Sequence, residues 1–228
     1  MAKRISALRA GSSAIVALGL LTACSTGATE QPASTGTATA MPASVTFMAD
    51  VHEEGGDTMT MAVTVEGAKV VAYTTNGNND EAYFFGTQKD GHMDLMSMYG
   101  DNLKASFDGG RLTGEVTMNE PRVASVKFAA SSVAAPAGLY TATHDGARAS
   151  WVVRPDHTMT GVMDNSAPGN HKVTDAVMAR SQAFKDSVRQ MRLDRQLHQA
   201  PPMAYGTWSM PMGGSMMKAV RVTGDMAF

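Results

Sequence analysis

Apolar and polar residues alternate with a period of two from Val45 onward, and this pattern constrains the fold most. Phe47, Ala49 and Val51 continue the apolar set that starts at Val45, and the stretch 58–65 repeats the alternation. Successive side chains of a β-strand point to opposite faces, so such a pattern predicts strands with one buried and one wetter face. We therefore expect the domain to be built from β-strands.

Turn signals recur at short intervals between further strand-like runs. They include Asn76-Gly77, Asp90-Gly91 and Asp108-Gly109-Gly110, residue types that favour tight hairpins. The runs expected to form strands are 69–74, 81–86, 92–98, 103–107, 112–118, 122–129, 138–143, 149–154 and 158–163. Many short strands at this spacing predict an all-β antiparallel meander, closed as a small barrel or folded as a sandwich. The last three runs are expected to continue the same sheet.

Residues 171–199 follow a different period. Their apolar residues fall mostly at three- and four-residue steps, without Gly or Pro, and Pro201-Pro202 follows. This predicts one long C-terminal α-helix. Its other face carries basic residues, which we expect to be solvated, with contact to a membrane surface or an acidic partner as the alternative. These residues are Arg180, Lys185, Arg189, Arg192, Arg195 and His198.

The first 24 residues predict export and a lipid anchor. A positive segment with Lys3, Arg4 and Arg9 precedes a short apolar stretch, which is typical of a secretory leader. Leu21-Thr22-Ala23-Cys24 resembles the lipobox of bacterial lipoproteins, and that resemblance implies diacylation of Cys24 after cleavage, with palmitate-type chains. We therefore predict an anchor in the outer face of the cell membrane.

The expected organisation has four parts. A leader spans 1–23, the lipidated Cys24 and a Thr/Ser/Ala/Pro-rich tether span 24–44, and the β-meander spans 45–168. The remaining segment, 169–228, is expected to contribute the helix and a final strand packed on the same domain. Loss of the leader would change the formal charge from -2 to -5, which gives no basic field for nucleic acid.

The sequence motifs favour a non-enzymatic role. Common nucleophile, zinc-protease, phosphate-loop and dinucleotide motifs are absent from the sequence. Carboxylates concentrate at His52-Glu53-Glu54 and at Asn78-Asn79-Asp80-Glu81. We interpret them as the polar residues of turns. No catalytic residue is predicted.

Methionine is unusually frequent, with 19 residues, and this suggests an alternative function. Thioether sulfur selects Cu(I), and imidazole can supplement it. Residues two apart on a strand share a face, so Met96 and Met98 could present two sulfurs together. The candidate copper ligands are His92, Met96, Met98, Met210, Met212, Met216 and Met217. The competing interpretation is that methionines fill the core, as expected for Met59 and Met61.

A further alternative is a carrier of lipid or another hydrophobic ligand, because small anchored barrels can enclose apolar ligands. The aromatic residues that could line its cavity are Tyr73, Tyr83, Phe84, Phe85, Phe107, Phe128 and Trp151.

Three segments carry a family resemblance. The residues are Val71-Ala72-Tyr73, Asn76-Gly77 and Glu81–Gly86, then Pro136–Tyr140, then Trp151–Asp156. Over residues 68–160 they resemble uncharacterised envelope lipoproteins of mycobacteria and relatives. The resemblance implies an actinobacterial origin and a non-enzymatic role, and it brings no catalytic residues.

Overall fold

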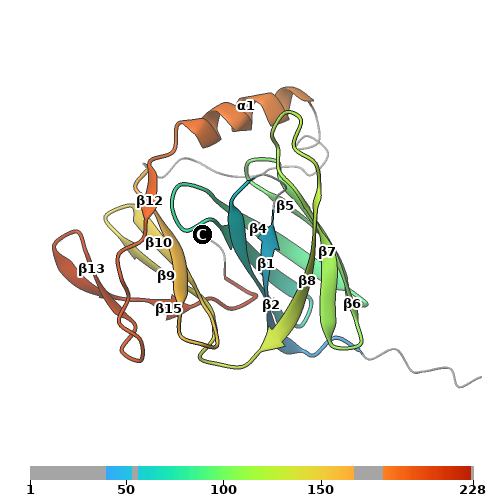
Figure 1. Cartoon of the computed structure of the whole chain (residues 1–228), viewed down its shortest axis with the longest axis horizontal. Helices are drawn as coiled ribbons and strands as arrows, with labels where there is room; N and C mark the ends of the chain where they lie inside the picture. The colour runs from blue at the N-terminus through green and yellow to red at the C-terminus, as the bar shows by residue number, and fades with distance from the viewer. Residues whose placement is uncertain (1–39, 53–55, 167–181, 227–228) are drawn as a thin grey trace, which may run out of the picture. The chain divides into compact units, whose positions relative to one another are not determined.

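Eight antiparallel strands form a closed barrel in the computed structural model, which describes residues 40–52, 56–166 and 182–226 (Figure 1). The strands are β1 (Ser44–His52), β2 (Thr58–Glu66), β3 (Lys69–Thr75), β4 (Glu81–Lys89), β5 (His92–Ser97), β6 (Asn102–Asp108), β7 (Arg111–Thr117) and β8 (Val126–Val133). Each strand pairs with the next, and β8 pairs with β1 through Thr46 and Val133. The predicted all-β meander is confirmed, and it closes as a barrel.

The strand positions follow the alternation in the sequence, with one displaced boundary. A strand was expected over 122–129, whereas β8 runs from Val126 to Val133. Pro121 lacks an amide hydrogen for the ladder, and Arg122 has a left-handed backbone with φ of 69°. Both features delay the start of the strand until the connection has ended.

The barrel interior is filled by side chains. Phe47, Met61, Phe84, Leu103 and Leu112 are fully buried in one cluster that spans the barrel. Met59 and Met61 belong to this core, as expected. A cavity beside Val51 and Met118 has a volume of about 10 Å³, which is on the scale of one water molecule.

A second sheet follows the barrel instead of extending it, in the strand order β12-β11-β10-β9-β15. Its strands are β9 (Gly138–His144), β10 (Ala147–Val153), β11 (Met159–Asp164), β12 (Leu197–Gln199) and β15 (Val220–Arg221). The expectation that 138–163 continues the first sheet is wrong. The pairing of β8 with β1 leaves the barrel no free edge for β9 to join.

Outward side chains of the barrel meet the second sheet in a separate apolar cluster. Tyr73 and Tyr83 project from β3 and β4, with ring centroids 4.5 Å apart. They pack with Leu139 and Val152 of the second sheet and with Val222 near the C-terminus. This cluster makes one exterior face of the barrel apolar.

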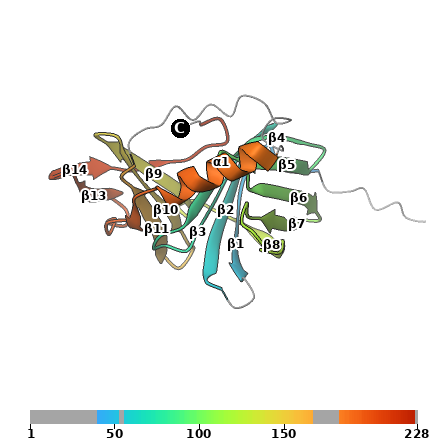
Figure 2. The same cartoon turned by 90° about the horizontal axis from the view of Figure 1, so that it is seen from above.

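The C-terminal segment contributes helix α1 (Gln182–Leu193) and a hairpin of β13 (Ser209–Met212) and β14 (Ser215–Lys218). The helix crosses the barrel end that carries the β5–β6 and β7–β8 connections (Figure 2). The expected helix was longer, but Leu197–Gln199 pair with β11 as a strand. The open edge of β11 satisfies their backbone groups. The expected helix start at 171 lies outside the described residues.

The packed barrel interior predicts a large effect for Phe47→Ala. Phe47 has no exposed surface, so its truncation leaves a cavity that should lower the free energy of unfolding by about 3–5 kcal/mol. Chemical denaturation measures this change. Met216, which is 68% exposed, provides the control: Met216→Ala should stay within about 0.5 kcal/mol of the parent protein. Equal losses in the two variants would contradict a packed interior.

Candidate functional site

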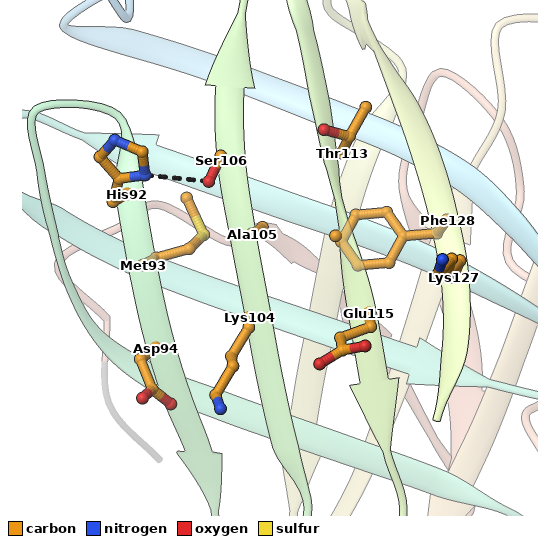
Figure 3. Close-up of a pocket in the computed structure, with 11 residues that line it drawn as sticks. His92, Met93, Asp94, Lys104, Ala105, Ser106, Thr113, Glu115, Lys127 and Phe128 are labelled. Atoms are coloured by element: carbon orange, nitrogen blue, oxygen red, sulfur yellow. Dashed lines mark hydrogen bonds between the residues drawn. The ribbon is translucent and has the colours of Figure 1, made fainter. Parts of the chain in front are cut away.

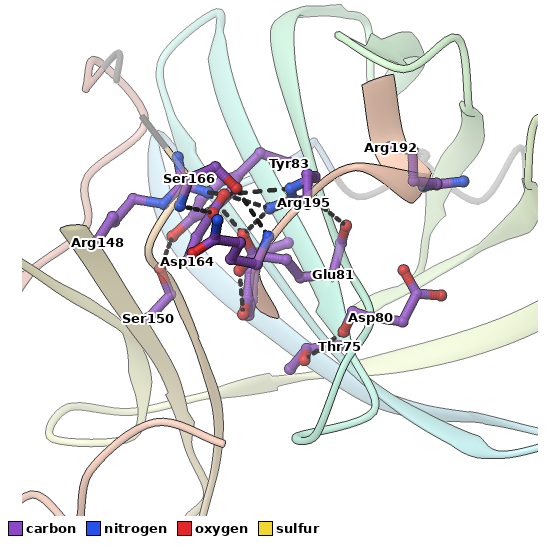
Figure 4. Close-up of polar contacts among 12 residues, drawn as sticks. Thr75, Asp80, Glu81, Tyr83, Arg148, Ser150, Asp164, Ser166, Arg192 and Arg195 are labelled. Carbon is purple, nitrogen blue, oxygen red and sulfur yellow. Dashed lines mark hydrogen bonds and ion pairs between the residues drawn. The ribbon is translucent and has the colours of Figure 1, made fainter. Parts of the chain in front are cut away.

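Four charged side chains form a buried cluster beside the barrel, which we call the charge network: Glu81, Arg148, Asp164 and Arg195 (Figure 4). Glu81 begins β4 and is only 1% exposed. Its Oε1 atom accepts a hydrogen bond from Arg148 Nη2 at 2.6 Å and another from Arg195. Arg195 also donates to Asp164 Oδ2 at 2.8 Å. Two guanidinium groups thus neutralise two carboxylates.

Two tyrosines complete the polar contacts of the charge network. Tyr73 donates its hydroxyl hydrogen to Glu81 Oε2 at 2.8 Å, and Tyr83 donates to Ser150 at 2.8 Å. Burial raises the pKa of both tyrosines, and for Tyr73 the nearby Glu81 carboxylate raises it further. Both phenols therefore remain protonated donors at neutral pH.

A second buried ion pair fixes α1 to the barrel. Arg192 binds Asp101 with both terminal nitrogens, at 2.9 and 2.6 Å. Asp101 has no exposed surface and also accepts hydrogen bonds from Ser97 and from the backbone N–H of Asn119. Arg189 donates to the carbonyl of Asn119. The side of α1 facing the barrel is therefore held mainly by charged and polar contacts.

The predicted solvated basic face is wrong for Arg192 and Arg195. Arg192 is buried, and the Arg195 side chain is only 5% exposed. Lys185 contributes its carbonyl to Asn119, whereas His198 is exposed on β12. Arg180 lies outside the described residues. Arginine tolerates such burial because its planar guanidinium can pair with several acceptors at once.

Glu81 was not recognised as a site residue from the sequence. It was assigned to turn polarity together with Asp80, which does lie in the β3–β4 connection. The available signal was its spacing: Glu81 and Tyr83 are two apart on β4 and share the barrel face that meets the second sheet. A carboxylate on such an apolar face requires a cationic partner.

A separate concave feature lies elsewhere, on the outside of β5–β8 (Figure 3). We call it the outer groove. Its volume is about 540 Å³, and charged side chains of all four strands line it. His92 lies in this groove, where its Nδ1 atom is 2.9 Å from the Ser106 hydroxyl.

The candidate copper ligands fall into separate parts of the fold. Met96 and Met98 are half-buried, but β5 ends at Ser97, so Met98 lies in a turn and does not continue the strand face of Met96. Met210 and Met212 are buried in the core of the second sheet, and Met217 packs against that core. Met216 is exposed. His92 and the hairpin methionines therefore lie in different sheets.

The histidine beside the methionine hairpin is His144. A Cβ atom at Gly213 would come within 2.3 Å of the His144 ring, which fills the space beside that turn. Across residues 40–52, 56–166 and 182–226, no three His, Cys, Asp or Glu side chains are grouped to hold a metal ion. Copper binding stays a prediction.

The aromatic residues expected to line a carrier cavity are divided among three clusters. Phe84 and Phe128 fill the barrel, and Phe107 packs against them. Tyr73, Tyr83 and Phe85 lie outside it, and Trp151 belongs to the core between the second sheet and the hairpin.

Cys24, the predicted lipidation site, lies outside the described residues. Within the part of the chain that the structure describes, no helix has the length and apolar character needed to cross a membrane. Family models, curated proteins and solved structures all gave no match to this chain.

Replacement of Glu81 by Gln should strongly destabilise the fold. The variant keeps the side-chain shape but leaves Arg148 and Arg195 with one carboxylate, and loss of a buried partner costs about 3–5 kcal/mol of unfolding free energy. Urea denaturation measures the loss. The control, Asp186→Asn, removes the exposed ion pair with Arg189 and should cost at most about 1 kcal/mol. A similar small loss at Glu81 would refute its structural role.

Replacement of Asp80 should stabilise the fold at neutral pH, in contrast to the replacement of Glu81. Burial raises its pKa; Arg192 lowers it, and the charges of Asp101 and Glu120 raise it further. A carboxyl whose pKa is higher in the folded than in the unfolded state destabilises the fold when ionised. Asp80→Asn should therefore be more stable than the parent at pH 7, with the gain disappearing below the unfolded pKa of 3.8. Thermal melts from pH 3 to pH 7 test this, and a destabilised variant at pH 7 would contradict it.

Proposed function

We propose that the protein is a lipid-anchored component of the cell envelope with a non-enzymatic binding or structural role. The observation that carries this proposal is the position of its single cysteine. Cys24 directly follows Leu21-Thr22-Ala23, at the end of a positively charged and then apolar leader. A diacylated residue gives stable attachment, because two acyl chains together exceed the marginal binding of one.

The organisation of the fold supports a role for the outer surface. The barrel interior is filled by Phe47, Phe84 and Leu112, and the adjoining cavity measures about 10 Å³. A carrier requires space for its cargo, commonly several hundred Å³. The outer groove, at about 540 Å³, is a concave surface of that size. The charge network has a structural role, because each of its carboxylates is neutralised by an arginine and each phenol is protonated.

Substitution of the cysteine tests the anchor. Cys24→Ala should abolish incorporation of labelled palmitate and move the protein out of the membrane fraction, because no acyl acceptor remains. The matched control is Ser25→Ala, the neighbouring residue, which should retain both label and membrane location. Unchanged labelling of Cys24→Ala would refute the proposed anchor.

Native mass spectrometry of the anchored protein separates the binding or structural role from the carrier alternative. The expected spectrum contains the chain with its covalent acyl groups alone. A noncovalent lipid retained at fixed stoichiometry would favour a carrier instead.

A further inference from the structure

The outer groove is built from two parallel rows of outward side chains that cross four strands. The strand register places His92, Ser106 and Thr113 side by side in one row. The second row, two residues further along each strand, contains Asp94, Lys104, Glu115 and Lys127. Neighbouring strands are about 4.8 Å apart, so this row is roughly 14 Å long.

The floor between the rows is the backbone of the strands, because the residues between the rows direct their side chains to the barrel core. Met93, Ala105, Gly114 and Phe128 occupy the intervening register positions. Gly114 has no side chain, and a Cβ atom there would lie 2.1 Å from the Lys104 carbonyl oxygen. This close approach requires glycine at this position. Met93 and Phe128 belong to the barrel core, and only 5% and 6% of their surface is exposed.

The charged row alternates in sign and has no net charge. Asp94 and Glu115 are acceptors, whereas Lys104 and Lys127 are donors. Asp94 accepts a hydrogen bond from Asn102 at 2.7 Å. The row therefore offers alternating acceptors and donors along a surface that selects for neither sign of charge.

We propose that the outer groove binds a neutral carbohydrate chain, which gives a ligand class to the binding role proposed above and rests on it. Each sugar hydroxyl both donates and accepts, so it can pair with a carboxylate, an ammonium group or the Ser106 and Thr113 hydroxyls. An ionic ligand attracted by one charge would be repelled by its neighbour about 4.8 Å away.

The test uses the full chain in detergent with an array of neutral oligosaccharides of glucose, mannose, galactose and N-acetylglucosamine. The best ligand is then titrated by isothermal calorimetry. Lys104→Gln/Glu115→Gln removes one charge of each sign at the centre of the row and leaves the net charge unchanged. We expect its Kd to rise by at least about tenfold, since hydrogen bonds to charged groups are among the stronger ones.

Asp108→Asn/Arg111→Gln is the matched control. Asp108 and Arg111 also pair across β6 and β7, but at the turn and outside the groove, so this variant should bind like the parent. Chemical denaturation of both variants shows whether the central charges contribute only to stability. An array without any neutral ligand, binding restricted to charged glycans or peptides, or equal affinity of the two variants would overturn the proposal. Labelling at Cys24 is measured separately, so such a failure leaves the proposed anchor standing.

Discussion

The carboxylate of Glu81 is the contact through which three parts of the fold are joined. It belongs to the barrel, while Arg148 belongs to the second sheet and Arg195 to the segment after α1. A buried carboxylate without partners is costly, so the barrel face at Glu81 is stable only when both arginines are in place. Apolar contacts of Tyr73 and Tyr83 surround this polar centre and exclude water from it. The interaction therefore links the second sheet and the segment after α1 to one side chain of the barrel.

The sequence was informative where local periodicity decides the structure. The alternation through Met59, Met61, Val63 and Val65 predicted β2, and Asp90-Gly91 predicted the turn between β4 and β5. Closure into a barrel depends on the pairing of β8 with β1, which is a contact between distant residues and has no local signal. The strand at Leu197–Gln199 had a helical pattern, but the open edge of β11 determined its conformation. Tertiary pairing thus overrode the local preference.

The sites were harder to predict because their residues are far apart in the chain. Glu81 is 67 residues from Arg148 and 114 from Arg195, and the sequence pattern placed Arg195 on a solvated helix face. The charged row of the outer groove required knowledge of the register across four strands. His92 was singled out for its neighbouring methionines, yet its partner is Ser106 on the next strand. Spacing along one strand could not reveal neighbours across the sheet.

The distribution of contacts along the chain also implies an order of assembly. The barrel is complete once residue 133 is available, because its strands pair with their sequence neighbours and the last closes on the first. The second sheet takes its edge strands from Leu197–Gln199 and Val220–Arg221, and contacts over such long separations form slowly. When the chain is made from its N-terminus, the barrel strands are therefore complete while Glu81 is still hydrated. Arg148 and then Arg195, which follow later in the chain, replace that water at Glu81.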